Sequence, residues 1–303
     1  MLDNLSKSLL KEISNLHKLP NGAVSFRKNG KGEIIQSSNN IIIEKKEDLS
    51  GINVYIKSSC KNEACHIPVV ITESGIFDLV YNDFYIEDGA VVTIVAGCGI
   101  HSDGESSHNG IHKFHIGKNA KVLYLENHLA TGNGKKKELN PVTVLEIGEN
   151  SEVTMNTTQL GGVTYSNRKT KATLKENATL YVNEKILTSG FEVAKTDFEI
   201  KLNGKNSKGN IISRSVAKQE SEQLFKSNLI GNNLCFGRVE CDAIVLNNSV
   251  VASQPKVTAK SNLASLSHEA TIGRIAKDQL IKLMSLGLTE EEATNKIIEG
   301  FLK

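Results

Sequence analysis

The segment FHIGKNAKVLY, residues 114–124, decides the fold, because four further stretches of the chain repeat its pattern. Each has an apolar residue, a polar turn rich in Gly, Asn or Asp, and a small residue, followed by a strand in which apolar and polar side chains alternate. Alternation with a period of two predicts that one face of every strand is buried. The related stretches are FYIEDGAVVTI (84–94), LEIGENSEVTM (145–155), ATLKENATLYV (172–182) and IKLNGKNSKGN (200–210).

The spacing of these stretches favours one fold class over its rivals. Their shared apolar residue recurs at steps of 30, 31, 27 and 28, at Ile86, Ile116, Ile147, Leu174 and Leu202. A strand-rich repeat of this length without a helical pattern in between predicts a mainly β protein, a parallel β-helix. An antiparallel sandwich would show turns every eight to twelve residues. A hexapeptide-repeat acyltransferase fold would repeat the apolar residue every six positions.

Helical patterns stand at both ends of the repeat. Residues 3–18 have amphipathic spacing, and Pro20 stops this N-terminal helix. Near the C-terminus a helix is predicted over 275–284, and the capping box at 289–292 opens a second one. The chain therefore divides into an N-terminal helical segment, a β-helix core and a C-terminal helical segment, with the boundaries 1–22, 23–265 and 266–303.

Composition excludes several classes of function. The net charge is +2, which does not mark a nucleic-acid or membrane binder. No run of eighteen apolar residues predicts a membrane-spanning helix, and the N-terminus lacks the continuous apolar core of a signal peptide. We therefore expect a cytoplasmic protein whose five cysteines are reduced thiols.

The stretch AGCGIHSDGESSHNGIHKFH, residues 96–115, holds one cysteine and four histidines. Strand parity places Cys98 and His112 on the buried face and His115 on the outer face, while His101 and His108 fall in the polar loop between the strands. The spacing matches no zinc template, and these residues are not expected to converge on one tetrahedral site.

From the residues alone, Cys60, Cys65 and Cys241 are expected to be structural and not functional. Cys60 and Cys65 are expected to be ordinary small residues. Cys241 shares its phase with Val239, which predicts a packed small hydrophobe. His268 and Glu269 are adjacent in an extended segment and therefore point apart.

The C-terminal sequence resembles that of a known protein family. GRVECDAIVL and SLSHEATIGRIAKDQLIKLMSLGLTEEEATNKIIEGFL resemble the core of the SufB/SufD family, scaffold subunits of SUF iron–sulfur cluster assembly, and the resemblance runs from about residue 75 to the end. It implies a right-handed parallel β-helix with an N-terminal helix and a C-terminal helical hairpin. It also implies a scaffold that is not itself an enzyme, carries a transient iron–sulfur cluster and works with the ABC-type ATPase SufC.

The resemblance assigns roles to six residues, and it implies that Cys98 accepts sulfur. Because glycine has no side chain, Gly97 and Gly99 are expected to let the backbone of a sulfur donor approach Cys98 closely. The resemblance also implies a role for His112 on the following strand and for Gln159 in the interior, where the phase of Gln159 with Met155 independently places it. The residues that hold the cluster would be Cys241, Glu269 and His268.

Two departures from the longer bacterial SufB proteins shape the expected partners. The N-terminal region is shorter, without a cysteine-rich motif, and the loop after Cys98 holds extra histidines, as in a compact SufB-like form from archaea and anaerobes. A homodimer would then replace the heterodimer with SufD and bring two copies of Cys241 together. Sulfur would come from a cysteine desulfurase or another donor, and the hairpin 272–302 would dock SufC. The alternatives are a carbohydrate-binding or carbohydrate-cleaving β-helix and a purely structural solenoid. The first needs an aromatic platform, which a chain with no Trp and six Tyr is not expected to have.

Overall fold

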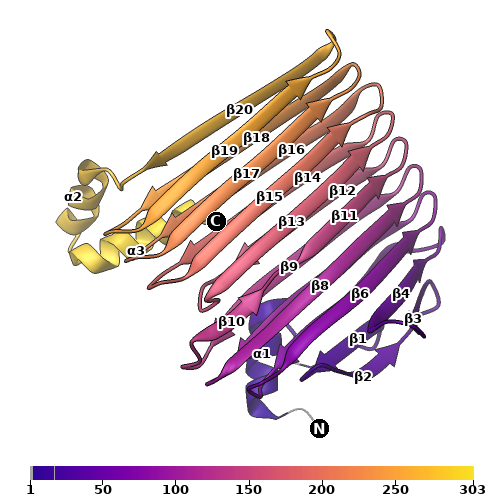
Figure 1. Ribbon diagram of the computed structural model, residues 1–303, viewed down its shortest axis with the longest axis horizontal. Coiled ribbons are helices and arrows are strands. Elements are labelled where there is room, and N and C mark those ends of the chain that lie inside the picture. Colours follow the sequence, from indigo (N-terminus) through magenta and orange to yellow (C-terminus); the bar gives the residue numbers. More distant parts are fainter. Residues whose placement is uncertain (1–2, 17) are drawn as a thin grey trace.

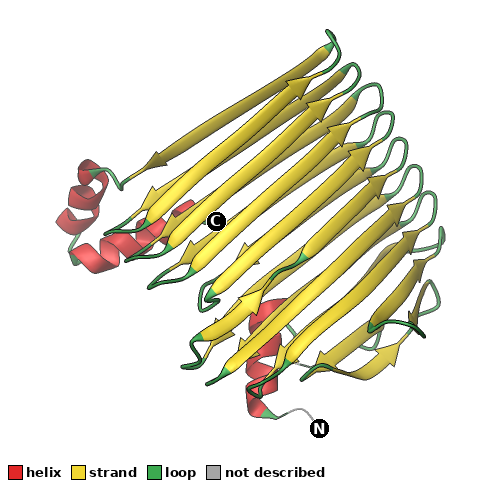
Figure 2. Cartoon of the chain, in the orientation of Figure 1, coloured by secondary structure: helices red, strands yellow, loops and turns green. Residues whose placement is uncertain are grey.

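The computed structural model describes residues 3–16 and 18–303, which form a parallel β-solenoid of about eight turns (Figure 1). Strands account for 59% of the chain and helices for 11%, and Figure 2 shows the helices confined to its two ends. Nearly every turn contributes one strand to each of two facing sheets. The predicted mainly β, parallel β-helix is therefore confirmed.

The first sheet, sheet A, has ten strands, and all pairings but β1 with β2 are parallel. Their spatial order is β2 (Lys31–Gln36), β1 (Ala23–Lys28), β5 (Lys61–Ile71), β7 (Val91–His101), β9 (Lys121–Thr131), β12 (Glu152–Gln159), β14 (Thr179–Thr188), β16 (Ser207–Ala217), β18 (Cys235–Val245) and β20 (Ala264–Gly273).

Sheet B faces it, also with ten strands, and only β3 and β4 pair antiparallel. The short strands β10 and β11 lie end to end between the same two neighbours, β8 and β13. The spatial order is β19 (Val250–Ala259), β17 (Glu222–Gly231), β15 (Val193–Leu202), β13 (Tyr165–Leu174), β10 (Lys136–Leu139) with β11 (Val142–Ile147), β8 (Glu105–Ile116), β6 (Phe77–Ile86), β4 (Gly51–Ile56) and β3 (Ile41–Lys45).

The repeated apolar residue of the sequence forms one continuous column in sheet B. Each member pairs in register with the next, and all are at most 6% exposed. Stacking identical positions at the same depth buries the column on every turn, which explains why the sequence keeps its step near thirty residues. The column consists of Ile86, Ile116, Ile147, Leu174 and Leu202.

The polar turn after each column residue needs a left-handed backbone. Gly89 has a φ of 70°, and Asn119, Asn150, Asn177 and Asn206 have φ values between 54° and 58°. Asparagine tolerates this conformation better than other residues with a side chain. The amide of Asn177 donates to Asn150 at 2.9 Å, and that of Asn206 donates to Asn177 at 3.1 Å. This ladder connects consecutive turns of the solenoid.

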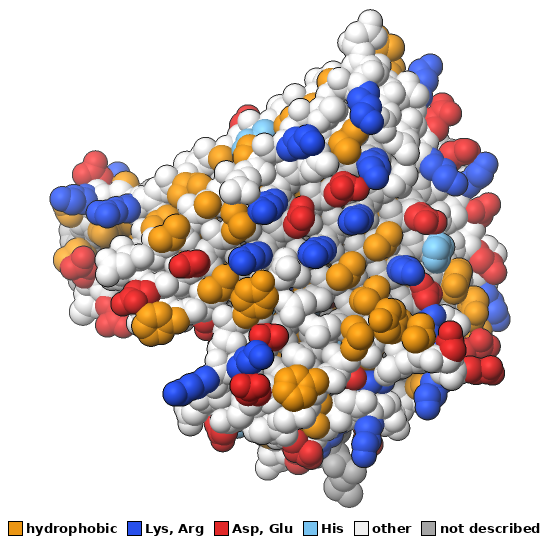
Figure 3. Space-filling model, in the orientation of Figure 1, with side chains coloured by type: hydrophobic (Ala, Val, Ile, Leu, Met, Phe, Trp, Pro, Cys, Tyr) orange, Lys and Arg blue, Asp and Glu red, His pale blue; other side chains and the backbone are white. Residues whose placement is uncertain are grey.

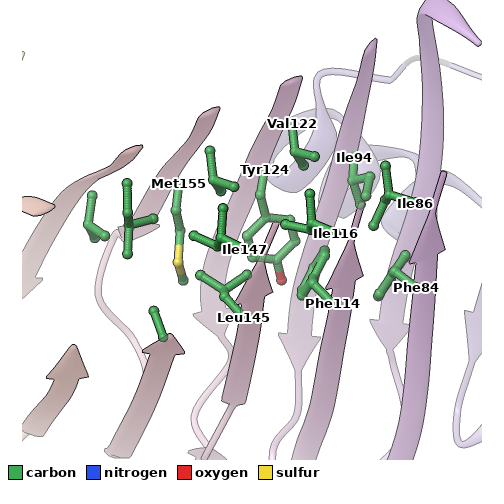
Figure 4. Packing of buried hydrophobic residues seen from close by; sticks show 14 of the residues in the cluster. Phe84, Ile86, Ile94, Phe114, Ile116, Val122, Tyr124, Leu145, Ile147 and Met155 are labelled. Atoms are coloured by element: carbon green, nitrogen blue, oxygen red, sulfur yellow. The ribbon is translucent and has the colours of Figure 1, made fainter. Parts of the chain in front are cut away.

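Aromatic rings fill the N-terminal half of the interior (Figure 4). Phe84 stacks on Phe114 with ring centroids 4.5 Å apart, and Tyr124 meets Phe114 edge-on at 5.0 Å. All three are at most 1% exposed. These rings form part of the apolar core of the solenoid.

Helix α1 (Asn4–Ser14) covers the outer face of sheet A, against β5, β7 and β9. Its N-cap Asp3 accepts from the backbone N–H of Ser6 at 2.7 Å. The helix ends at Asn15, which has a φ of 53°, so the predicted extension to residue 18 and the stop at Pro20 were wrong.

Helices α2 (Lys277–Ser285) and α3 (Glu290–Phe301) form the C-terminal hairpin. The capping box between Thr289 and Glu292 is present as predicted, and Gly287 has the positive φ of a helix-ending residue, 95°. Strand β20 continues to Gly273, eight residues beyond the boundary expected at residue 265. Within the described part of the chain, no helix is long and apolar enough to cross a membrane.

Candidate functional site

Cys98 lies inside the solenoid on β7, where its side chain is 1% exposed, as strand parity predicted. It lines a cavity of about 20 Å³ between the sheets. A cavity of this size holds about one water molecule. The other titratable groups on its wall are His108, His112, Glu126 and His128.

The cavity makes the Cys98 thiol a weak acid. Burial is the main cause that raises the pKa of Cys98 well above 9, and the carboxylates of Asp78 and Glu126 raise it further. A neutral thiol is a poor nucleophile, because the thiolate is the reactive form. Chemistry at Cys98 therefore needs a base nearby.

Two histidines of β8 face the cavity, each held by a side chain of β6. The Nδ1 of His108 is 3.0 Å from Oδ2 of Asp78, and the Nδ1 of His112 is 3.4 Å from Nδ2 of Asn82. Burial lowers the pKa of His112 to about 4, so its ring is neutral at pH 7. The predicted inward position of His112 is confirmed.

The other histidines of this stretch take separate positions. His101 ends β7 and its Nδ1 lies 2.9 Å from Oγ1 of Thr131. His115 points outward, as predicted, and bonds Glu146 at 3.1 Å. His108 belongs to β8 and is 6% exposed, so its expected place in a polar loop was wrong. Among residues 3–16 and 18–303, no three His, Cys, Asp or Glu side chains are grouped to hold a metal ion.

Gly97 and Gly99, the neighbours of Cys98, face the outer side of sheet A, where α1 lies on them. A Cβ at Gly97 would stand 2.8 Å from the carbonyl oxygen of Ile13, and one at Gly99 would stand 3.1 Å from the Cβ of Leu9. A helix of the same chain therefore occupies the place at these glycines that was expected for a sulfur donor.

Gln159 stands two strands from Cys98 on the same row of sheet A. Cys98 pairs in register with His128, and His128 pairs with Gln159. Gln159 is 6% exposed and its Nε2 has no hydrogen-bond partner, so a polar group points into the interior as expected. An unpaired buried amide costs about 1–3 kcal/mol and is rarely retained without a role.

A parallel row of inward-facing residues runs toward Cys241. Consecutive members pair in register across β9, β12, β14, β16 and β18, and each is at most 2% exposed. Burying two carboxylates in such a row is costly unless they are paired. The row consists of Glu126, Thr157, Glu184, Ser213 and Cys241.

Arg168 on β13 reaches across from sheet B and joins the two carboxylates. Its Nη1 forms an ion pair with Glu126, and its Nε lies 3.7 Å from Oε1 of Glu184. Its Nη2 is 3.3 Å from Nδ1 of His128. Glu184 also accepts from Ser213 at 2.8 Å. Polar contacts therefore continue from the Cys98 cavity toward Cys241.

The two carboxylates differ in their acidity. Burial pushes the pKa of Glu126 upward, but the Arg168 guanidinium outweighs it, and the pKa lies well below 4.5. For Glu184 burial prevails over the more distant guanidinium, and the pKa is raised. Glu126 is thus the fixed anion of this cluster.

At the far end, Cys241 and Glu269 point to opposite faces of sheet A. Cys241 is 1% exposed inside the solenoid, and burial raises the pKa of its thiol to about 11. Glu269 pairs in register with Glu240 and accepts from Arg238 at 2.8 Å on the outer face. His268 shares the inner face with Cys241, and its Nε2 has no partner. One chain therefore brings His268, but not Glu269, to the face of Cys241.

Comparison with known proteins shows the family of the chain. Residues 78–301 match the family model described as SUF system FeS cluster assembly, SufBD core domain. The chain belongs to the SufBD family. An iron–sulfur cluster assembly SufBD family protein of Methanocaldococcus jannaschii is 30% identical over 275 residues, covering 88% of this chain and 86% of the relative. Relatives of the same description from Archaeoglobus fulgidus and Pyrococcus horikoshii are each 28% identical, covering 84% of this chain and 70% and 57% of their own lengths.

Several buried polar residues of this SufBD chain escaped the sequence interpretation. Their signal was present in the alternation of the strands: Glu126 shares the phase of Tyr124, Arg168 that of Ala172, and Glu184 that of Val182. A charged residue in the buried phase of a strand is rare unless it is paired. Their ion pairing across the two sheets depends on which turns face each other. Sequence spacing alone does not predict that arrangement.

Proposed function

We propose that the chain is a scaffold for the assembly and transfer of iron–sulfur clusters. In this proposal sulfur is accepted at Cys98 and leaves the interior at Cys241. The observation that carries it is the continuous buried polar lining between the two thiols, which crosses five strand-to-strand steps from β7 to β18. At a strand spacing of about 4.8 Å these steps span roughly 24 Å, too far for one direct transfer.

The interior residues suit a path for sulfur in its anionic forms. Arg168 lies midway and shares its charge with Glu126 and Glu184, so its guanidinium N–H groups are the donors on this part of the path. His112 and Gln159 offer neutral polar groups near the start. A persulfide or sulfide anion needs such partners, because burying a bare charge between apolar sheets is costly.

A transient cluster at Cys241 would draw its ligands from more than one place. Thiolate, imidazole and carboxylate groups all bind iron, and the weaker ones allow release. His268 is on the side of Cys241, whereas Glu269 would reach a cluster only outside its own sheet. We therefore expect a second copy of the chain to contribute the remaining ligands.

The C-terminal end of the solenoid supports that second copy. Val257 and Ile272 occupy inward-facing positions of the last two strands, yet they are 40% and 41% exposed. Strands β19 and β20 also end their sheets with free edges. An uncapped apolar interior with free edges suits a two-fold interface, and we propose a homodimer there.

We propose that the C-terminal hairpin docks the ATPase SufC. The apolar side of α3 is partly used by the chain itself, since Ala293 is 0% and Ile298 5% exposed. On and just after α2, Ile281, Met284 and Leu286 are 62%, 41% and 79% exposed. We place the docking surface there, with ATP hydrolysis confined to the partner and the complex in the cytoplasm.

A carbohydrate-binding role remains a second candidate because one observation favours it. Tyr55, Tyr85 and His115 form a stacked ladder on the outer face of sheet B, with ring centroids 5.1 Å and 5.0 Å apart. Hydrophobic side chains gather over these strands on the face shown in Figure 3. Calorimetric titration with soluble oligosaccharides tests this role, and saturable heat abolished by Tyr85→Ala would support it.

Anaerobic reconstitution with iron and sulfide tests the scaffold function. We expect visible absorption from a bound cluster in the parent protein and its loss in Cys241→Ser, which should fold normally because the change in volume is small. Cys235→Ser is the matched control, since Cys235 is buried on the same strand outside the polar row. A Cys241→Ser spectrum equal to that of the parent would contradict the ligand role.

A further inference from the structure

A chain of three contacting groups, the partly exposed Arg27 and the buried Asp78 and His108, leads to the Cys98 cavity from the N-terminal side. Arg27 on β1 contacts both carboxylate oxygens of Asp78, at 2.7 and 3.3 Å. Asp78 on β6 contacts Nδ1 of His108 on β8 at 3.0 Å. The side chains of Asp78 and His108 are 4% and 7% exposed. A carboxylate that orients an imidazole beside a thiol is the arrangement of a general base and its nucleophile.

The bond to Asp78 fixes how the His108 ring can act. A carboxylate at Nδ1 holds the proton there, leaves the lone pair of Nε2 available and stabilises the imidazolium once a second proton arrives. His108 and Cys98 line the same cavity of about 20 Å³, which is large enough for about one water molecule, and a single water is a sufficient relay between an acid and its base.

The other two histidines of the cavity are poorer bases. His112 is bonded to the amide of Asn82, and burial lowers its pKa to about 4. His128 has the Arg168 guanidinium 3.3 Å from its Nδ1, and its pKa is lowered by burial. Its carboxylate neighbour, Glu126, is already paired with Arg168. Asp78 is also paired, with Arg27, but it lies 3.0 Å from the Nδ1 of His108. Glu126 lies 3.5 Å from the Nε2 of His128, whose Nδ1 faces Arg168 instead. Among the three histidines of the cavity wall, His108 therefore has the carboxylate at Nδ1 that leaves Nε2 available.

We propose that His108, oriented by Asp78, is the base that removes the proton from the Cys98 thiol when sulfur is accepted. The inference rests on the proposed role of Cys98 as sulfur acceptor and names the group that makes it possible. Asp78 is a positioning residue, and Arg27 holds Asp78 in place.

The reaction balances without an oxidant. With a donor persulfide R–S–SH, His108 takes the thiol proton and the Cys98 sulfur attacks the terminal sulfur of the donor. A bond forms between Cys98 Sγ and that sulfur, and the donor S–S bond breaks. The donor leaves as a thiolate and receives the proton from His108, so Cys–SH and R–S–SH become Cys–S–SH and R–SH.

Modification of Cys98 by methyl methanethiosulfonate, a small thiol reagent, tests the pair in the full chain. The rate at Cys98 is divided by the rate at Cys65, a second buried thiol, and both are read from peptide masses between about pH 6 and pH 9. Dividing by Cys65 removes any general opening of the fold. The variants are Asp78→Asn and His108→Gln. Glu146→Gln is the matched control, because it breaks the carboxylate–histidine pair on the outer face of the same strand.

We expect the ratio at neutral pH to fall about a hundredfold in both variants, which is the usual contribution of a positioned base. The rise of the rate with pH should move to higher pH, because only hydroxide then deprotonates the thiol. The groups that face this thiol, namely Asp78, His108, His112, Glu126 and His128, remain the same in the control, which should match the parent.

An unchanged ratio and pH profile in His108→Gln would overturn the proposal, even if Asp78→Asn were disturbed by the loss of the partner of Arg27. Incubation with a donor persulfide separates this inference from the proposed function. Equal amounts of Cys98 persulfide in the parent and in His108→Gln would refute the role of His108 as base and support the role of Cys98 as sulfur acceptor. The opposite result is a lowered modification rate in the variants together with no persulfide on Cys98 of the parent. It would support His108 as the base and refute Cys98 as the sulfur acceptor.

Discussion

Replacing Arg168 by Met tests whether the interior charges form one coupled cluster. The guanidinium compensates two buried carboxylates, Glu126 and Glu184, and Met keeps most of its volume. Removing one partner of a buried ion pair costs about 3–5 kcal/mol, because the remaining charge is left uncompensated. We expect a loss in the free energy of unfolding in this range at pH 7, measured by urea denaturation followed by circular dichroism.

The pH dependence of that loss has a definite sign. In the parent, the lowered pKa of Glu126 gives stability that is present above the ordinary carboxyl pKa of 4.5 and is lost as the pH falls through the folded value. Without Arg168, burial raises the pKa of both carboxyls, and a raised carboxyl pKa makes the fold more stable as the pH falls toward 4.5. The deficit of the variant should therefore shrink between pH 7 and about pH 5.

The matched control is Lys201→Met, which removes a partially exposed ion pair with Glu199 at 3.0 Å. Such surface pairs contribute about 0–1 kcal/mol, so little change is expected at either pH. A loss below about 1 kcal/mol in Arg168→Met, or a loss that grows on acidification, would refute the coupled cluster.

Two further predictions concern the helices. Gly97→Ala places a Cβ 2.8 Å from the Ile13 carbonyl oxygen of α1. We expect this variant to be destabilised by about 1–3 kcal/mol and to be cleaved faster by proteases near α1. An unchanged digestion pattern would contradict the close packing of that helix. Two variants test the docking surface: truncation after Gly273, which preserves β20, and Leu286→Asp. Both should abolish co-purification with the ATPase. A truncated chain that still binds the ATPase at full stoichiometry would show that the hairpin is not the docking surface.

The sequence predicted the fold well because its strongest signal is local and repeated. The column from Ile86 to Leu202 and the asparagine turns follow from a period and from backbone conformation, which neighbouring residues determine. The inward positions of Cys98, His112 and Gln159 followed from strand parity for the same reason.

The site could be predicted less completely, because it depends on contacts between turns. Parity showed that His268 and Glu269 point apart, but the resemblance joined both to Cys241, and in one chain only His268 lies on that side. The seating of α1 on Gly97 and the pairing of Asp78 with His108 join residues 30 or more positions apart. Neither leaves a pattern in the local sequence.

The most direct test of the central claim is time-resolved mass spectrometry of cysteine persulfides after anaerobic incubation with a cysteine desulfurase and cysteine. The account predicts a persulfide on Cys98 that accumulates in Cys241→Ser, and none on Cys241 in Cys98→Ser. A persulfide that reaches Cys241 in Cys98→Ser would contradict the interior path. So would labelling of Cys60, Cys65 or Cys235 without any on Cys98.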